Sequence, residues 1–322
     1  MNSLLAQRSG RESGGSFRRL GRWLDAVPHP DLVCLISPER VAAARWGPHR
    51  LEAFAEEPLP AGAIRPSPAQ ANVVDSAAVA QALRKVAERV RGLRHETALL
   101  LPDSIVRIFL LGFETFPRKP SEAVPLLRWR LRKSVPFPVE ETVLSWCEQR
   151  SVEESLEVVT AVARQSVIEE YEGLAREAGL EAGVVLGETL AALPLVEDGP
   201  AVLLARLGGA SLTTAVIDSG GLALYRCAEL SVQPDPQALL DEIFPAVAYF
   251  QDRAHRDIEV VRLAGMESYG PGLLQRVERE LGCPVRALGE ESSGLEHLPD
   301  GAGDLLSRQL ASLVGWHLNR GA

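Results

Sequence analysis

The sequence lacks the short motifs by which several enzyme classes are recognised. It contains three lysines, Lys85, Lys119 and Lys133, and none of them follows a glycine-rich run, so a P-loop nucleotide site is excluded. Its six histidines form no H-E-x-x-H pair and no G-x-S-x-G segment is present, so no zinc protease or serine hydrolase of these types is indicated. The four cysteines form no C-x-x-C pair, which favours reduced thiols over a zinc site or a disulfide framework.

Long apolar runs and an excess of basic residues are also missing. The longest stretches without charge, 207–217 and 309–319, are far shorter than the roughly 20 apolar residues of a membrane span. Residues 1–15 are polar and contain no secretory signal, so we expect a cytoplasmic protein. The net charge of −9 argues against nucleic acid as a partner. With 322 residues, 46% of them hydrophobic, the chain is long enough for two domains.

Hydrophobic periodicity predicts two lobes of similar construction. Strand-like runs at 32–36, 41–46 and 51–54 precede a helix and a strand at 98–101, an order typical of a mixed sheet covered by helices. The helix is expected to begin at Asp75 or Ser76. Its apolar positions are Val79, Leu83, Val86, Val90 and Leu93.

The second half repeats that order. A strand ribbon at 202–226 precedes a helix near 240–250, a strand at 260–263 and a helix at 273–281 that Gly282 ends. We therefore expect a cleft between two lobes. The lobe boundary is placed near the turn-prone segment Asp198–Pro200.

The ribbon at 202–226 has the composition of a phosphate-binding hairpin. We interpret it as two strands joined by Asp218-Ser-Gly-Gly221, with Gly208, Gly209 and Ser211 clustered within the ribbon. Glycine there leaves backbone N–H groups open to a ligand oxygen. A nucleotide site of this kind also needs an acidic residue just before the first glycine, to hold a metal ion or its water. Arg206 and Leu207 occupy those positions, so the hairpin is interpreted as a phosphate site that has lost its metal-binding group.

Several blocks of the sequence follow one another in a characteristic order and spacing. They include Leu101-Pro-Asp-Ser104, Phe116-Pro117, Val135–Trp146, Gly270–Leu273, Cys283–Val285 and Leu313–Arg320. In this order and spacing they resemble the PilM family of type IV pilus assembly proteins, relatives of the division protein FtsA. The resemblance extends from about Asp31 to the end of the chain.

The resemblance implies a mixed α/β, two-lobed actin-like fold. A basic tail at 1–30 would precede a first lobe at 31–198, with a small subdomain inserted at about 104–172. The second lobe would occupy 199–322 and end in a helix. In the family, ATP lies between the lobes, held by two phosphate hairpins and a glycine turn on the adenosine side.

The same resemblance implies a scaffolding role in pilus assembly. The cytoplasmic tail of a PilN-like membrane protein would bind as an extended peptide, in the groove between the insertion and the rest of the first lobe. Candidate groove residues are Leu101, Val106, Ile108 and Phe109. Ordinary sheet core is the alternative interpretation of these four side chains.

The chain departs from the family where nucleotide chemistry would occur. The aspartates of both hairpins are replaced, which predicts loss of the magnesium site because this cation requires carboxylate or water oxygens. Arg206 could pair with phosphate directly, or it could bond a carboxylate such as Glu39 in a cleft without nucleotide, which we favour. The first hairpin has Leu35, Ser37, Pro38, Glu39 and Ala42 at the family's motif positions. If ATP is bound without a normal magnesium site, its contacts would be Gly208, Gly209, Ser211, Thr213, Gly265 and Arg206.

These observations predict a PilM-like adaptor that has lost or weakened nucleotide binding, has no catalytic residues or metal, and lies peripheral to the inner membrane through its partners. Two alternatives stay open. One is an active actin-like ATPase. The other is the cytoplasmic domain of a GspL-like type II secretion protein, which predicts a membrane-spanning helix after the last block, whereas this chain stops at Ala322.

Two basic segments add candidate contacts. Residues 1–24 contain five arginines and one glutamate, with apolar side chains at helical spacing within 17–24, a pattern that suits either an anionic membrane surface or a solvated tail with a short docking helix. Arg128, Arg130, Arg132 and Lys133 surround Trp129. That run could meet an acidic partner segment, although a solvated helix face is the more common outcome.

Overall fold

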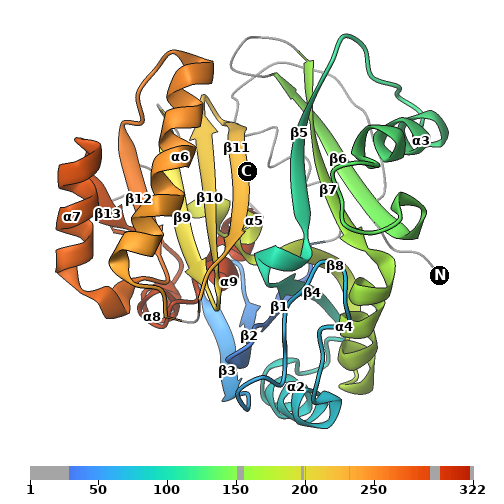
Figure 1. The fold of residues 1–322 in the computed structure, drawn as a ribbon. Helices are drawn as coiled ribbons and strands as arrows, with labels where there is room; N and C mark the ends of the chain where they lie inside the picture. Colours follow the sequence, from blue (N-terminus) through green and yellow to red (C-terminus); the bar gives the residue numbers. More distant parts are fainter. Residues whose placement is uncertain are drawn as a thin grey trace.

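The computed structural model describes residues 29–150, 156–196, 199, 201–231, 233–290 and 298–319. The basic segment 17–24 and the expected lobe joint, apart from residue 199, lie outside this range. Two five-stranded sheets and a three-stranded sheet organise the described residues, and Figure 1 shows the three-stranded sheet beside the second lobe and above the first.

The first sheet has the strand order β3-β2-β1-β4-β8. Strands β1, β2 and β3 form an antiparallel meander, and β4 and β8 continue the sheet parallel to β1. All five side chains of β1 are buried, as expected for a central strand covered on both faces. The strands are β1 (Leu32–Ile36), β2 (Arg40–Trp46), β3 (Leu51–Pro58), β4 (Glu96–Leu101) and β8 (Glu181–Gly187).

Helices α2 (Ser76–Val90) and α4 (Gln165–Glu177) pack into the core on one face of this sheet. The Asp75 side chain caps α2 by accepting a hydrogen bond from the Ala78 amide at 2.9 Å, one of the two predicted starts. The predicted helix is one turn too long. Gly92 has φ +59°, a conformation that glycine adopts freely and that ends the helix, so Leu93 lies beyond it and is 97% exposed.

The second sheet repeats the first with the order β11-β10-β9-β12-β13. The ribbon at 202–226 was predicted to have two strands but has three, because Gly209, with φ +58°, makes an additional turn between β9 and β10. The strands are β9 (Val202–Gly208), β10 (Ser211–Asp218), β11 (Gly221–Glu229), β12 (Val260–Ala264) and β13 (Val285–Ala287). Helices α6 (Pro236–Ala254) and α7 (Pro271–Leu281) cover its outer face, and Gly282 ends α7 in the left-handed conformation, as predicted.

A smaller unit interrupts the first lobe after β4. Its strands are β5 (Arg107–Phe113), β6 (Thr142–Arg150) and β7 (Leu156–Arg164), in the order β5-β7-β6, and helix α3 (Pro120–Leu131) covers one face. The expected insertion, about 104–172, overlaps the start of α4. That helix packs in the first-lobe core, so the three-stranded unit ends with β7. Short 3-10 turns are η1 (Asp103–Ile105), η2 (Val139–Glu141), η3 (Leu193–Leu195) and η4 (Glu267–Tyr269).

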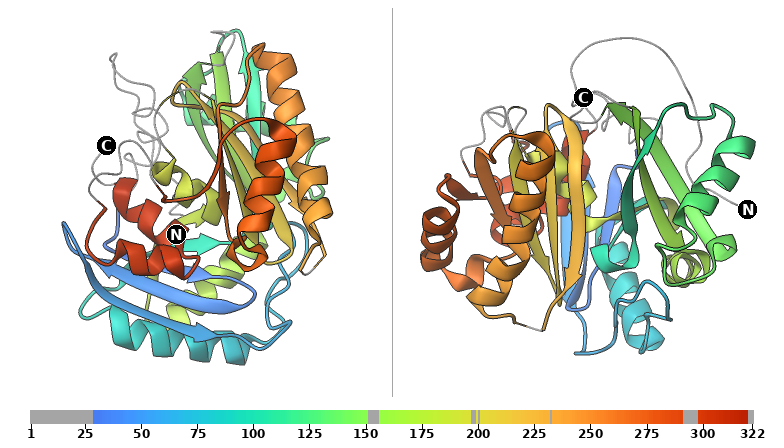
Figure 2. Two further views of the ribbon diagram at one scale, coloured as in Figure 1. Left: turned by 90° about the vertical axis from the view of Figure 1, so that its left-hand side faces the viewer. Right: turned by 45° about the horizontal axis from the view of Figure 1, so that its top comes forward.

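The two large sheets share one apolar core, which lies between them. Helices α5 (Glu188–Ala192), α8 (Ala302–Ser307) and α9 (Ala311–Leu318) contribute to it, and Figure 2 shows α8 and α9 beside the first sheet. The Trp46 indole donates to the Leu313 carbonyl at 3.1 Å, and the Trp316 ring stacks on His29 with centroids 4.0 Å apart. No helix among the described residues is long and apolar enough to cross a membrane.

Candidate functional site

The inter-lobe cleft lies where the turns and strand ends of the two sheets meet. A cavity of about 290 Å³ is lined by the β1–β2 turn, the β9–β10 turn, the end of β12 and the start of α5. The predicted nucleotide contacts Arg206, Gly208, Gly209 and Gly265 all line it. The sequence therefore identified the main elements of the cleft.

Backbone conformation at the two glycine turns is specialised. Gly209 has φ +58° and Gly265 has φ +73°, a region that other residues rarely adopt. A Cβ atom added to Gly265 would also clash with the Leu207 carbonyl oxygen, so the β9 and β12 ends approach closely only because residue 265 has no side chain. The Ser211 hydroxyl donates back to the Gly208 carbonyl at 3.0 Å and thus closes the hairpin internally.

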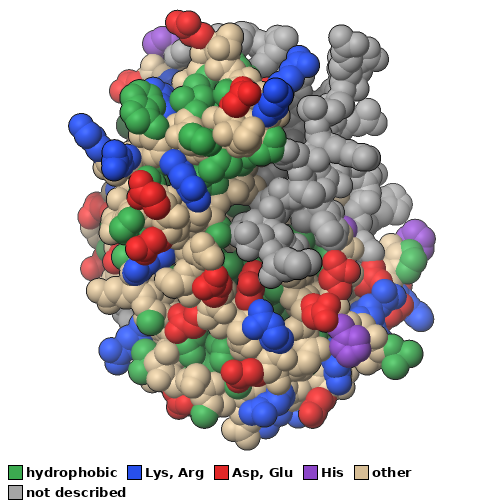
Figure 3. Space-filling view, turned by 90° about the vertical axis from the view of Figure 1, so that its right-hand side faces the viewer, with side chains coloured by type: hydrophobic (Ala, Val, Ile, Leu, Met, Phe, Trp, Pro, Cys, Tyr) green, Lys and Arg blue, Asp and Glu red, His purple; other side chains and the backbone are tan. Residues whose placement is uncertain are grey.

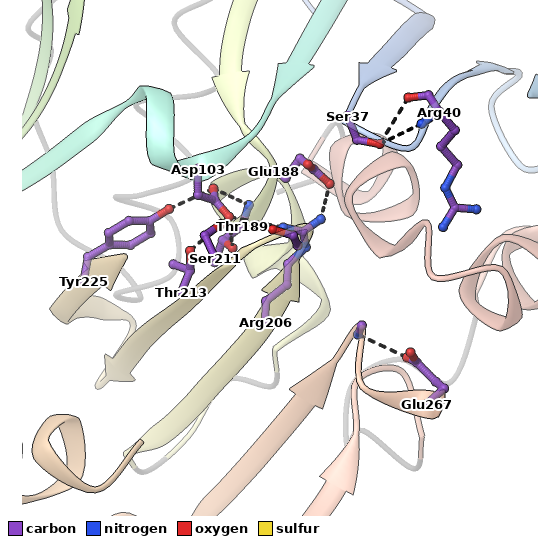
Figure 4. Close-up of polar contacts among 12 residues, drawn as sticks. Ser37, Arg40, Asp103, Glu188, Thr189, Arg206, Ser211, Thr213, Tyr225 and Glu267 are labelled. Carbon is purple, nitrogen blue, oxygen red and sulfur yellow. Dashed lines mark hydrogen bonds and ion pairs between the residues drawn. The ribbon is translucent and has the colours of Figure 1, made fainter. Parts of the chain in front are cut away.

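Asp103 occupies the centre of a buried polar network between the lobes (Figure 4). From the first lobe, its carboxylate accepts hydrogen bonds from the Thr189 amide at 2.9 Å and the Thr189 hydroxyl at 2.5 Å. From the second lobe it accepts from Arg206 at 3.2 Å, from the Thr213 hydroxyl at 3.2 Å and from the Tyr225 hydroxyl at 3.0 Å. A carboxylate that is 3% exposed is thus fully supplied with donors.

Arg206 bridges two carboxylates of the first lobe. One guanidinium nitrogen pairs with Asp103 and the other with Glu188, so the carboxylates that hold it are these two rather than Glu39, the partner suggested from sequence. Burial raises the pKa of Glu188 to about 7 although Arg206 lowers it, and the nearby Asp103 charge raises it further. The same two carboxylates raise the pKa of Arg206 against the effect of burial.

Two further polar groups at the cleft, on Gly265 and Ser37, are bonded within the chain. The Gly265 amide donates to the Glu267 carboxylate at 3.2 Å. The Ser37 hydroxyl donates to the Arg40 carbonyl at 3.1 Å and accepts from the Arg40 amide at 3.3 Å. Arg206, the Ser37 hydroxyl and the Gly265 amide therefore already have acceptors within the chain.

The cavity lining carries no excess of positive charge for an anionic ligand, because Glu39, Glu188 and Glu267 line it together with Arg40 and Arg206. Among the described residues, no group of three or more His, Cys, Asp or Glu side chains is placed to hold a metal ion. The two carboxylates nearest Arg206, those of Asp103 and Glu188, pair with that guanidinium.

The sequence identified Arg206 and Thr213 but not their partners. Thr213, a predicted nucleotide contact, is 1% exposed and its hydroxyl points to Asp103. Asp103 lies within one of the blocks that carry the family resemblance, and Glu188 is the first residue of the helix after β8. An acidic residue at the end of a buried strand was the available signal for both.

A second concave site lies between the insertion and the second lobe, whereas the sequence resemblance placed the peptide groove between the insertion and the rest of the first lobe. This interstrand groove, of about 530 Å³, is formed by residues 106–109 of the β5 end, 133–136 after α3, and 225–227 of β11. Three candidate groove residues, Val106, Ile108 and Phe109, line it. Leu101 does not, because its side chain is fully buried in the first-lobe core.

The interstrand groove combines apolar and cationic surface with strand edges. Among the described strands, β5 pairs with β7 alone and β11 pairs with β10 alone, and the two edges lie near each other (Figure 1). Arg107, Lys133 and Arg226 line the groove together with Val135 and Pro136. Such a surface has the features that bind an extended peptide through backbone pairing and side-chain pockets.

A separate contact fixes the insertion against the second lobe. The Gln149 side chain of β6 donates to the Leu222 carbonyl at 2.6 Å and accepts from the Leu222 amide at 3.1 Å. The buried Glu157 carboxylate pairs with Arg253 of α6 at 2.7 Å and accepts from Gln149 at 2.9 Å. One groove wall is therefore held to the lobe that forms the other wall.

No protein-family model and no curated protein sequence matches the chain. Solved structures share its fold. A PilM–PilN type IV pilus biogenesis complex matches with 20% identity over 91% of this chain and 98% of that chain, at a TM-score of 0.71. A protein of unknown function with an actin-like ATPase fold from Bacteroides thetaiotaomicron matches with 11% identity over 87% and 95% of the two chains, at a TM-score of 0.51.

The cytoplasmic domain of EpsL, an inner membrane component of the type II secretion system of Vibrio cholerae, matches with 13% identity. The match covers 88% of this chain and 93% of that domain, at a TM-score of 0.50. Together these similarities confirm the predicted mixed α/β, two-lobed actin-like fold. The PilM–PilN structure also agrees with the resemblance seen in the sequence blocks.

Proposed function

We propose that this chain is a PilM-like adaptor of a type IV pilus inner-membrane assembly complex, and that it binds the cytoplasmic tail of a PilN-like membrane protein without needing nucleotide. The observation that carries the proposal is the contrast between the two concave sites. In the cleft, Arg206 and the Gly265 amide are bonded to carboxylates of the chain itself, whereas the interstrand groove presents strand edges and apolar side chains.

The proposed loss of nucleotide binding rests on the energetics of the cleft. For ATP to contact Arg206, this guanidinium would have to leave two buried carboxylates, and each lost charge-assisted hydrogen bond costs about 1.5–3 kcal/mol. The phosphates would then share the cavity with Glu39 and Glu188, and Arg206 could not neutralise both the phosphates and the two carboxylates that it now holds. We infer that the chain is a pseudo-ATPase in which internal ion pairs replace the bridging role of the nucleotide.

The proposed partner site rests on the interstrand groove. An extended peptide could pair with the edge of β5 or of β11, and its alternate side chains could pack on Val106, Ile108 and Phe109. This assigns the chain a cytoplasmic position, peripheral to the inner membrane through its partner. We propose a pilus system rather than a secretion system because the PilM–PilN structure has the higher TM-score, 0.71 against 0.50 for the EpsL domain.

Binding of a labelled peptide tests the proposal. The probe is a fluorescein-labelled peptide of the PilN-like protein's cytoplasmic tail from the same genome, titrated with the full chain and followed by anisotropy. Arg107→Glu and Phe109→Ala should each weaken binding about tenfold or more, as expected for contacts at the centre of an interface. Val74→Arg, at a position that is 60% exposed in the first lobe, is the control. Saturable binding that these groove variants leave unchanged would contradict the site.

A further inference from the structure

Helix α3 has a buried side and two flanks that its own arginines fix to the sheet. Ala123, Leu127 and Leu131, four residues apart, are buried. Arg128 donates to the Thr142 carbonyl at 3.1 Å on one flank. On the other, Arg130 donates to the Gly112 carbonyl at 3.3 Å and lies 5.3 Å from the Phe113 ring centroid. These two cations therefore have a structural role.

The opposite side of α3 presents a tryptophan among cations. Trp129 is 69% exposed, which is uncommon for a side chain of this size. On a helix its surface neighbours are three and four residues away; of these, Pro125 and the C-cap residue Arg132 are exposed and Leu126 is half-buried. Lys133, in the turn after α3, is also exposed. We call Pro125, Trp129, Arg132 and Lys133 the α3 outer face. Nothing in the fold of the described residues requires a tryptophan there, because its indole lies outside the core of this unit.

Charge around the α3 outer face differs in sign from that of the whole protein. Residues 114–133 contain six basic and two acidic side chains, in a chain of net charge −9. The neighbouring turn η2 carries Glu140 and Glu141, of which Glu141 pairs with Arg164 at 3.0 Å. Figure 3 shows Lys and Arg side chains beside hydrophobic ones on the upper part of the face it draws. The local field therefore favours an anionic partner.

We propose that the α3 outer face binds the anionic headgroups of a lipid bilayer. Tryptophan is enriched at membrane interfaces because it has an apolar body and a polar N–H, and adjacent Arg and Lys side chains extend to headgroup phosphates. The helix lies at the periphery of the molecule in Figure 1, where a flat surface can reach it. A lipid surface fits these observations better than an acidic protein segment, which would need a groove to receive the indole.

The position of this face is consistent with the partner site but does not depend on it. Lys133 belongs to the α3 outer face and also lines the interstrand groove. A membrane-protein tail that leaves the groove beside Lys133 would bring the bilayer to the same side of the molecule. Lipid binding is a property of the chain alone and can be measured with no partner present.

Co-sedimentation with vesicles tests the proposal. The full chain is mixed with phosphatidylcholine vesicles, with or without 30% phosphatidylglycerol, at low and moderate salt. We expect binding only to the anionic vesicles, weakened by salt. The variant Trp129→Ser/Arg132→Glu/Lys133→Glu should bind at least about tenfold less, because each cation near an anionic surface contributes measurably. All three positions are exposed, and circular dichroism melting checks that folding is unchanged.

Two further variants identify the segment responsible. Arg276→Glu/Arg279→Glu on α7, on the opposite side of the molecule (Figure 1), changes the net charge equally and should retain vesicle binding. Arg18→Ser/Arg19→Ser/Trp23→Ser alters the basic N-terminal segment. Unchanged binding by the α3 variant, or loss of binding only in the N-terminal variant, would overturn the proposal. Retention on a polyglutamate resin with no vesicle binding would overturn it too, in favour of an acidic protein segment.

Discussion

Replacing Arg206 by methionine is the most informative perturbation of the inter-lobe network. Methionine keeps much of the side-chain length and the apolar contacts but removes the charge and the hydrogen bonds to Asp103 and Glu188. Both carboxylates remain, with side-chain exposures of 2% and 5%. They then face each other without the cation that now lies between them.

The structure sets the size of the expected effect. Removing one partner of a buried ion pair costs about 3–5 kcal/mol, because the remaining charge stays desolvated. For a protein of this size that loss corresponds to a fall in Tm of roughly 4–7 °C. Arg40→Met is the matched control. It removes another cleft arginine, but that side chain and its partner Glu56 are 30% and 29% exposed, so its loss should cost no more than about 1 kcal/mol.

Urea unfolding at pH 8, followed by circular dichroism and checked by calorimetric melting, measures both variants. Adding Glu188→Gln to Arg206→Met should recover part of the loss, because the uncompensated charge is then reduced. An Arg206→Met protein that is no less stable than the Arg40→Met protein would refute the reasoning, since the network would then contribute nothing to joining the lobes.

Three other predictions follow from the same geometry. Burial raises the folded-state pKa of Glu188 from 4.5 to about 7, so its stabilising contribution is complete below pH about 4.5 and is lost as the pH rises to 7. In urea unfolding, the wild-type free energy of unfolding should therefore fall between pH 5 and 8, and this fall should exceed that of Glu188→Gln by up to about 2–3 kcal/mol. Parallel pH profiles of the two proteins would argue against a raised Glu188 pKa. Gln149→Ala should lower the free energy of unfolding by about 1–3 kcal/mol. It should also speed hydrogen exchange at the Leu222 amide, because that amide donates to the Gln149 side chain. An unchanged exchange rate would count against this contact between the insertion and the second lobe. Gly265→Ala should lower the free energy of unfolding by about 1–3 kcal/mol in chemical denaturation, because residue 265 has a positive φ and its Cβ would clash with the Leu207 carbonyl. The control Gly272→Ala has open space around the added Cβ and should not lower it. Equal effects of the two substitutions would show that the Gly265 turn is unstrained.

Local signals in the sequence account for the parts of the fold that were predicted. The repeated order of buried strands and amphipathic helices indicated two lobes, because burial on both faces leaves an unbroken apolar run such as Leu32–Ile36. Asp75 and Gly282 carried enough local information to place a helix start and a helix end. The apolar spacing alone predicts that this helix continues to Leu93, whereas it ends at Val90, just before Gly92.

The network of the cleft could not be predicted because its members are distant in sequence. Asp103 and Arg206 are 103 positions apart, and Asp103 and Tyr225 are 122 apart. Only the folded arrangement of three chain segments shows that Arg206 meets two carboxylates rather than Glu39. The interstrand groove is similar, because no local pattern indicates that the edge of β5 lies beside β11. The cleft network and the interstrand groove therefore depend on contacts between elements distant in the sequence, which hydrophobic periodicity does not specify.

The proposed function without nucleotide requires that the cleft does not bind ATP. Titration calorimetry of the purified full chain with ATP, with and without magnesium and repeated on Arg206→Asp, measures this directly. We expect no binding heat from the wild-type chain in either buffer, because Arg206 is bonded to Asp103 and Glu188 and the Gly265 amide to Glu267. Magnesium-dependent binding by the wild type, or magnesium-independent binding that Arg206→Asp abolishes, would contradict the account.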